Sequence, residues 1–420
     1  MSAPQLQPET PQQGEATESA IEPQIESVID PVIEEDELIH WLALRVTPNL
    51  GPIGAVKLIR KFGTPQAIFQ ASKEDLERTG IPAGTAASVA SGCAFDEAVT
   101  QHQKLIEAGA HLIPITHAAY PKLLKEIPDA PPVLFARGHV DLLHRLSIAV
   151  VGTRRPTAYG KAAAGRLAQD LANAGLVITS GMARGIDTSA HRAALDATGD
   201  TIAVFGCGVD ELYPAENRKL ADEIAQRGLI LSDFPMATPP YPQHFPMRNR
   251  IVSGISVGVL VIEGGEYSGS AITARIAAEQ GRTVFAVPGN ITSRQSWGPN
   301  LLIKQGAKLV QEWNDVIAEL EPADRRRLVA ETSGQLTLNH QEPGGSDDSD
   351  SPDSAKQPGT PVAREILATI PPDQPVALDH LLESKPHISA SEVMAVLFDL
   401  ELSGMIRQLP GKYFVKVWQR

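Results

Sequence analysis

The sequence is poor in cysteine and in aromatic residues. Its 420 residues include two cysteines, Cys93 and Cys207, and 5% of the chain is aromatic. Two cysteines in separate segments do not support a disulfide framework or a cysteine zinc cluster, so we expect both to be small buried hydrophobic residues. The sequence predicts no metal site and no cofactor.

A long hydrophobic run is also missing. No apolar stretch approaches the roughly 18 residues needed to cross a bilayer, and the amino terminus has no basic start followed by an apolar core. Hydrophobic residues nevertheless make up 42% of the chain, which is enough for a sizeable core. We therefore predict a soluble, cytoplasmic protein of about two to four domains, without a membrane partner.

Basic residues are not in excess, since the formal net charge is -13. The acid is concentrated in two segments: residues 1–40 contain ten Asp or Glu and no Lys or Arg, and residues 332–360 contain five acids and one lysine. These segments together carry -14, so the rest of the chain is close to neutral. The total charge therefore does not exclude a nucleic-acid partner.

Composition and hydrophobic periodicity divide the chain into six segments. The first is rich in Pro, Gln and Glu without a period, and such a segment cannot offset its chain entropy by burial. We predict a disordered acidic tail (1–36), a helical SAM/helix-hairpin-helix-like module (37–100), a connecting segment (101–146) with a short strand near residues 111–115, a Rossmann-like domain (147–320), a flexible acidic linker (321–360) and a winged-helix domain (361–420).

Glycine turns mark the helical module. Asn49–Arg60 contains two glycines at a predicted helix start, and Gly80–Gly84 opens another short helix. Turns of this kind resemble helix-hairpin-helix modules, whose main-chain amides can face a DNA phosphate. Any tight helical hairpin needs the same glycines, so both interpretations stay open.

The carboxy-terminal segment regains hydrophobic periodicity. Three helix-like stretches precede a strand pair with a predicted turn at Pro410 and Gly411. This order is typical of a winged helix, which binds either DNA or protein.

Between residues 147 and 320, apolar β-rich runs alternate with Ala-rich, helix-like stretches. This alternation predicts an α/β domain with a parallel sheet covered on both faces, and ligands of such sheets bind at the carboxyl ends of the strands. The predicted strands are Ser147–Val151, Leu176–Gly181, Thr201–Gly208, Leu229–Ser232, Val257–Gly265 and Thr283–Gly289.

The loop after the first strand, Gly152–Pro156, does not follow the dinucleotide fingerprint. The second strand ends at Ser180 and Gly181 with no acid that would hold a ribose, so a nicotinamide-dependent oxidoreductase is disfavoured. What the first loop offers is a helix start, Thr153 and two guanidinium groups, which suit a phosphate.

Three later loops extend this pattern. Asp187 is predicted to cap the helix that carries His191. Phe245 with Arg248 and Arg250 offers a base platform and two phosphate donors, although an internal ion pair would explain the same arginines. Glu263–Arg275 is a further glycine-rich anion cradle at a helix start.

No nucleophile with its base, metal-ligand set or matched carboxylate pair is evident at a readable spacing. The pattern therefore favours a binding protein over an enzyme.

The ordered motifs Gly152–Pro156, Ser180–His191, Gly206–Asn217, Phe245–Gly254 and Val261–Ala274 closely resemble the DprA/Smf family of DNA-processing proteins. The resemblance covers Leu38–Leu320. It implies a homodimer that binds single-stranded DNA without cutting it, protects it and loads the RecA recombinase in natural transformation, with a single-strand-binding protein as a further partner.

The resemblance also implies a set of DNA-binding residues. They are Gly152, Thr153, Arg154, Arg155, Ser180, Gly181, Arg184, Gly185, Phe245, Arg248, Asn249, Arg250, Gly264, Ser268, Gly269 and Ser270. Relatives are expected to carry lysine near the positions of Ala215 and Pro242, and Arg218 and Lys219 offer a replacement for that charge.

Two other functions share part of this sequence pattern. Nucleotide-cleaving hydrolases of the lysine-decarboxylase-like class share a Rossmann-like sheet, but their P-G-G-x-G-T-x-x-E motif is not matched by Glu263–Ser270. A transcriptional regulator would use the winged helix to bind specific duplex sites.

Overall fold

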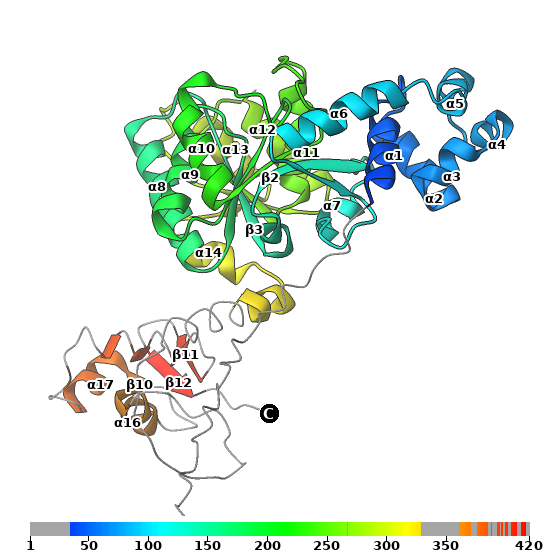
Figure 1. The fold of residues 1–420 in the computed structure, drawn as a ribbon. Helices are drawn as coiled ribbons and strands as arrows, with labels where there is room; N and C mark the ends of the chain where they lie inside the picture. The colour runs from blue at the N-terminus through cyan, green and yellow to red at the C-terminus, as the bar shows by residue number, and fades with distance from the viewer. Residues whose placement is uncertain are drawn as a thin grey trace, which may run out of the picture. The chain divides into compact units, whose positions relative to one another are not determined.

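The computed structural model describes residues 34–266 and 268–328, and in the carboxy-terminal part residues 361–370, 376–384, 388, 393–394, 396–397, 400–401, 405–409 and 413–416. The chain forms two compact units, one up to Gln341 and one from Glu342 (Figure 1). None of the described helices is long and apolar enough to cross a bilayer. The predicted tail up to residue 33 and the linker from residue 329 lie outside the described residues.

The larger unit is built on a nine-stranded sheet in the order β1-β2-β6-β5-β4-β3-β7-β8-β9. The six predicted strands are confirmed and pair in parallel with one another. Their bounds are β3 Ser147–Val151, β4 Val177–Ser180, β5 Thr201–Val204, β6 Leu229–Ser232, β7 Gly258–Val261 and β8 Thr283–Ala286, and β9 Lys308–Leu309 follows in parallel with β8.

The connecting segment is part of this sheet, which the sequence-based boundaries did not predict. Strands β1 (His111–Pro114) and β2 (Val133–Gly138) form an antiparallel pair, and β2 pairs antiparallel with β6. The predicted short strand near residues 111–115 is confirmed as β1, whereas the prolines that follow it had indicated only turns and extended chain, so β2 was not predicted. Helix α7 (Lys122–Glu126) lies between the two strands in the sequence.

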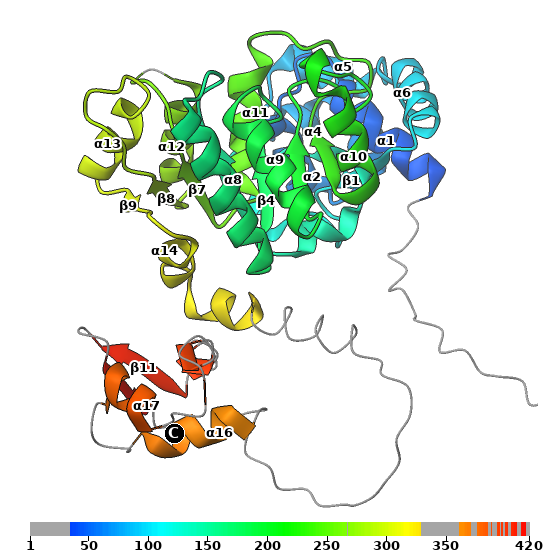
Figure 2. The same ribbon diagram turned by 90° about the vertical axis from the view of Figure 1, so that its left-hand side faces the viewer.

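Alternate residues of the central strands enter two separate cores. Ile148 and Val150 of β3 pack with helices α8 (Ala158–Asn173) and α9 (Ile186–Ala197), whereas Ala149 and Val151 enter the core on the other face. The period of two residues in a strand produces this division. The remaining helices of the unit are α10 Arg218–Arg227, α11 His244–Gly254, α12 Gly269–Glu279, α13 Trp297–Lys304 and α14 Trp313–Ala318, with 3-10 turns at Val140–His144 and Ala215–Asn217. Figure 2 shows α8, α9 and α10 side by side across one face.

The amino-terminal module is helical, as predicted. Its helices are α1 Glu35–Val46, α2 Pro52–Phe62, α3 Pro65–Gln70, α4 Lys73–Glu77 and α5 Ala83–Ala90, followed by α6 Phe95–Glu107. Helix α2 has a proline in its first turn and ends at Gly63, whose φ of 84° suits a glycine. Figure 1 shows the module beside the β1–β2 end of the sheet.

Two predicted boundaries were slightly wrong. Helix α1 begins at Glu35, inside the segment predicted as a disordered tail. Residues 322–328, predicted as the start of the linker, are helical, and Leu328 packs in the core with α8.

The described part of the smaller unit agrees with a winged helix. Helices α16 (Pro361–Thr369) and α17 (Leu378–Ser384) accompany a three-stranded sheet in the order β10-β12-β11, with β10 at Val376–Ala377, β11 at Ile406–Leu409 and β12 at Tyr413–Lys416. The pair β11–β12 is antiparallel. The predicted turn at Pro410 and Gly411 lies outside the described residues.

Candidate nucleic-acid interface

The strand order reverses between β3 and β7, the two central neighbours of the sheet. Open α/β sheets bind their ligands at such a point, outside the carboxyl ends of the strands. Here the two loops are joined directly, because the Thr153 amide donates to the Glu263 carbonyl oxygen at 2.7 Å. A side chain at Gly152 would collide with Ile186 and with this carbonyl oxygen, so the loop has no room for any residue but glycine.

The start of helix α8 is occupied by a carboxylate of the protein itself. The buried Glu263 side chain accepts from the Thr157 amide at 2.9 Å and from the Thr157 hydroxyl at 2.6 Å. The Thr157 oxygen in turn accepts from the Gly160 amide at 3.1 Å. The sequence had indicated a free helix start for a phosphate, but the Thr157 and Gly160 amides are already satisfied within the protein.

Asp187 braces the next loop, in a way that differs from the prediction. It does not cap helix α9, whose N-cap residue is Gly185, but lies in the first turn of that helix. Its Oδ2 accepts from the amides of Gly181 and Ala183 at 3.2 and 3.3 Å. Burial raises the pKa of the Asp187 carboxyl, and the charge of Arg248 opposes this shift. The role is structural, as expected, but it stabilises the preceding loop.

Arg248 lies beneath the same loop and not on the surface. Its Nη1 donates to the Gly181 carbonyl oxygen at 2.6 Å and also to that of Val204. A side chain at Gly181 would overlap the guanidinium. Burial lowers the pKa of Arg248 to about 10, and the nearby Asp187 carboxylate opposes the shift. The predicted role as a phosphate donor does not match this buried position.

Arg250 forms the internal ion pair that was the alternative interpretation of the motif. Its Nη2 donates to the Asp233 carboxylate, and its Nη1 donates to the Asp129 carbonyl oxygen at 2.6 Å. Both side chains of the ion pair are about one-tenth exposed. Arg250 therefore joins the β6 loop to helix α11 and is not available on the surface.

A group of charged and aromatic side chains, Arg154, Phe245 and Tyr213, lies partly or fully exposed at the edge of the sheet. The guanidinium carbon of Arg154 lies 5.7 Å from the centre of the Phe245 ring. The Tyr213 ring lies 5.2 Å from the same ring at an angle of 45° and is 39% exposed. A cation and two aromatic rings thus stand together at the mouth of the loops. This combination suits the face of a base and its phosphate.

The other predicted surface residues are distributed around this group. Arg155 is exposed, while Arg184 is exposed but paired with Glu216 at 2.5 Å. Ser268 caps helix α12 by accepting from the Ala271 amide at 3.3 Å, and its hydroxyl lies 2.8 Å from that of Ser270. Ala215 and Pro242 are exposed, as are Arg218 and Lys219.

The predicted site residues thus fall into two sets. Those buried within the loops are Ser180, Gly181, Arg248, Arg250, Gly264 and Ser270; those partly or fully exposed are Gly152, Thr153, Arg154, Arg155, Arg184, Gly185, Phe245, Asn249, Ser268 and Gly269. The sequence had no means of separating the two sets, because glycine loops and arginines serve both purposes.

Tyr213 and the Glu263 side chain were not identified from the sequence as members of the site. Glu263 follows a buried strand directly and precedes two glycines, and a carboxylate at that point was a signal for a helix-start ligand within the protein. The contact of Tyr213 with Phe245 could not be predicted, because the two residues are far apart in the sequence.

His191 is fully buried behind the loops. Its Nδ1 lies 2.7 Å from the Thr201 hydroxyl, which itself donates to the Ile178 carbonyl oxygen at 2.6 Å. The hydroxyl proton is therefore used, so His191 carries its proton on Nδ1. Its Nε2 has no hydrogen-bond partner, and burial lowers the pKa of His191 to about 3.

The fold and site define an α/β protein with a doubly wound sheet. The loops at the point where the strand order reverses are stabilised by internal carboxylates, and their exposed surface includes an arginine and two aromatic rings. Residues 111–321 match the family described as DNA recombination-mediator protein A, and residues 350–412 match the family described as DprA winged helix domain. The chain belongs to the DNA recombination-mediator protein A family.

Individual relatives agree with this assignment. Protein Smf of Escherichia coli (strain K12) is 40% identical over 304 residues, which are 72% of this chain and 76% of that protein. DNA processing protein DprA of Bacillus subtilis (strain 168) is 49% identical over 215 residues, 51% of this chain and 72% of that protein. The X-ray structure of DNA processing protein A from Streptococcus pneumoniae is 37% identical, with a TM-score of 0.60 over 67% of this chain and 97% of that chain.

Proposed function

We propose that this protein binds single-stranded DNA across the carboxyl edge of the sheet and does not cut it. The observation that carries the proposal is the placement of Arg154 over the Phe245 ring, with Tyr213 against the same ring. Aromatic faces bind the faces of unpaired bases whatever their sequence, and arginine adds a cation for the strand. A duplex keeps its base faces stacked and hidden, so it should bind less well.

The proposed contact surface is formed by the exposed set of site residues. Arg154 and Arg155 supply cations next to Phe245, and Ser268 and Gly269 border the loop after β7. The buried Arg248 and Arg250 hold the loops in shape from within. A chemical step has no support among the described residues, since the carboxylates Glu263 and Asp187 are both engaged with main-chain amides.

Membership in the family supports further parts of the proposal. We infer that the protein acts in the cytoplasm as a homodimer, protects the strand, and loads RecA onto it in transformation or recombination, with a single-strand-binding protein as a further partner. Light scattering at micromolar concentration would contradict the dimer if it detected only monomer. Strand exchange by RecA on DNA coated with single-strand-binding protein should accelerate when this protein is added.

The direct test compares oligonucleotide binding in single-stranded and duplex form over a range of salt concentrations. The single strand should bind more tightly, and its log affinity should fall with log salt by about 0.7 for each phosphate contact. The oligonucleotide should be recovered at full length. Equal affinity for both forms at every salt concentration would contradict the proposal, and release of free base from nucleoside monophosphates would favour the hydrolase alternative.

A further inference from the structure

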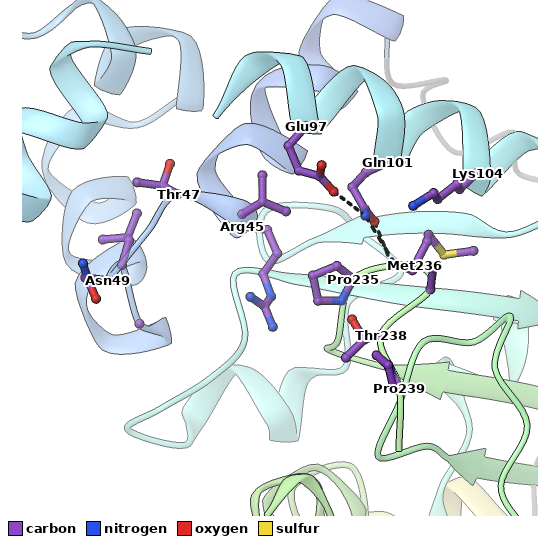
Figure 3. A pocket seen from close by; sticks show the side chains of 14 residues that line it. Arg45, Thr47, Asn49, Glu97, Gln101, Lys104, Pro235, Met236, Thr238 and Pro239 are labelled. Carbon is purple, nitrogen blue, oxygen red and sulfur yellow. Dashed lines mark hydrogen bonds between the residues drawn. The ribbon is translucent and has the colours of Figure 1, made fainter. Parts of the chain in front are cut away.

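A cavity of about 780 Å³ lies between the helical module and the loop after β6 (Figure 3). One wall comes from the end of α1 and the start of α2, and includes Arg45, Asn49 and Gly51. The opposite wall is the segment 235–239, and α6 closes the cavity with Gln101 and Lys104. The cavity lies outside the group of Arg154, Phe245 and Tyr213, and it includes Asn49 and Gly51 of the glycine turn that resembles a helix-hairpin-helix module.

Gln101 holds helix α6 against the segment 235–239. Its Oε1 accepts from the Met236 amide at 2.7 Å, and its Nε2 donates to the Met236 carbonyl oxygen at 3.3 Å. Gln101 is buried, and Figure 3 shows it reaching from α6 to the opposite loop. The width of the cavity is therefore fixed before any ligand binds.

Two cationic side chains line the cavity, and both have donors without a hydrogen-bond partner among the described residues. Arg45 donates from Nε to the Asp233 carbonyl oxygen at 2.8 Å, and within the described part of the chain its two terminal amino groups have no partner. Lys104 is half-buried and has no hydrogen bond or ion pair to any described residue. Glu97 is the one carboxylate among the lining residues, and it accepts from Gln101 at 2.9 Å. The charges of the lining residues, two cations and one carboxylate, therefore favour an anionic ligand.

The start of helix α2 adds to this balance. Gly51 is the N-cap residue of this 11-residue helix, and no side chain caps it. The amides of a first helical turn carry partial positive charge and have no partner within the helix. Of this turn, Gly51 lines the cavity and Pro52 has no amide hydrogen, so the donors on two of its walls come chiefly from Arg45 and Lys104.

The loop that forms the far wall also packs against the proposed DNA surface. The Phe234 ring stacks on His244, next to Phe245 in the sequence, with ring centres 4.2 Å apart. The Ala237 amide donates to the Asp210 carboxylate at 2.9 Å in the loop after β5. Arg154 follows β3 and the cavity wall follows β6. Three strand spacings, about 14 Å, separate these two strands, a span that a few nucleotides of single strand can cover.

We propose that this cavity is a second phosphate subsite, which takes the backbone of the same single strand beyond the base-stacking surface. The proposal rests on the proposed function and extends it. A strand must extend past the aromatic rings to reach the cavity. Lys104 should therefore increase the affinity for long strands and have little effect on the affinity for short ones.

The test measures fluorescence anisotropy with the shortest oligothymidylate that the full-length protein binds and with one of about 20 nucleotides. Lys104→Glu reverses a charge on α6. Asn49→Asp adds one on the α2 wall and keeps the side-chain shape, which suits the positive φ of 61° at that position. Lys122→Glu, on an exposed position of α7, changes the net charge as Lys104→Glu does and serves as the control.

We expect Lys104→Glu and Asn49→Asp to weaken binding of the long strand by roughly tenfold and to change binding of the short strand less than twofold. The salt slope for the long strand should fall by about 0.7 for each lost phosphate contact. Equal weakening at both lengths, or weakening no larger than that of Lys122→Glu, would overturn the subsite. If the unmodified protein binds neither strand, the proposed function itself fails, which is a separate result.

Discussion

The Glu263 carboxylate lies at the amino end of helix α8, where it accepts from both the amide and the hydroxyl of Thr157. It takes the position that a ligand phosphate occupies in many folds of this type. Asp187 does the same for the loop amides of Gly181 and Ala183. The loops therefore keep their shape without a ligand, and in the proposed function we expect exposed side chains to make most contacts with the strand.

Arg154→Ala should weaken single-strand binding by roughly ten- to a hundredfold. A charge-assisted contact of this kind contributes about 1.5–3 kcal/mol. Arg154 is exposed and has no ion-pair partner within the described residues, so thermal stability should change little. Binding titrations and melting curves on one preparation measure both quantities.

The matched control for this variant is Arg166→Ala. Arg166 lies on helix α8 with a side chain 78% exposed, and its removal changes the net charge by the same amount. Its affinity should stay close to that of the unmodified protein. Unchanged DNA affinity in Arg154→Ala, whatever its melting temperature, would remove Arg154 from the interface.

Phe245→Leu and Tyr213→Leu should each reduce affinity for single strands, because each removes an aromatic face and keeps a side chain of similar hydrophobicity. Loss of one base stack costs about 1–3 kcal/mol, which is roughly five- to a hundredfold in affinity. Tyr213→Phe keeps the ring and should bind almost normally. If Tyr213→Phe is as weak as Tyr213→Leu, the hydroxyl and not the ring face is the important group.

Arg248→Met should destabilise the fold and affect DNA binding only through that loss. It leaves the Gly181 and Val204 carbonyl oxygens without a donor and the buried Asp187 without its nearby positive charge. Removing one member of a buried charge pair costs about 3–5 kcal/mol. Urea unfolding measures the cost, and adding Asp187→Asn should recover part of it. Normal stability combined with lost DNA binding would instead make Arg248 a direct contact.

Stability should fall as the pH drops below about 6.5, with His191 as one cause. The pKa of this residue is about 3 in the folded protein and near 6.5 in the unfolded chain, so between these values the unfolded state binds the additional proton. The contribution is about 1.4 kcal/mol per pH unit. Urea unfolding at pH 7.5 and 5.5 should show a smaller pH effect in His191→Gln, and an identical pH effect in both proteins would contradict this assignment.

The sequence predicted the central sheet well because buried parallel strands leave a strong local signal. All six apolar runs between residues 147 and 320 are strands, and their loops meet at one edge. The antiparallel strand β2 was missed, since it belongs to a proline-rich segment and joins the sheet through pairing with β6, which is distant in the sequence.

The site was harder to predict than the fold. Arg154, Arg248 and Arg250 look equivalent in the sequence, yet one is exposed and two are buried with main-chain or carboxylate partners. A guanidinium can be buried only where hydrogen-bond acceptors from distant parts of the sequence surround it, and the local sequence does not indicate where these acceptors lie. The contact of Tyr213 with Phe245 was hidden for the same reason.

The pairing of Gln101 with both main-chain polar groups of Met236 affects how the helical module can be studied. Deleting the amino-terminal helices together with α6 would leave a buried amide and carbonyl group in the β6 loop without partners, and would also free the Asp233 carbonyl oxygen from Arg45. A shortened protein would then differ from the full chain in the shape of that loop as well as in its missing surface. Shortened proteins that begin after α6 are therefore unsuitable for assigning a function to the module, and point substitutions on its surface are the better tool.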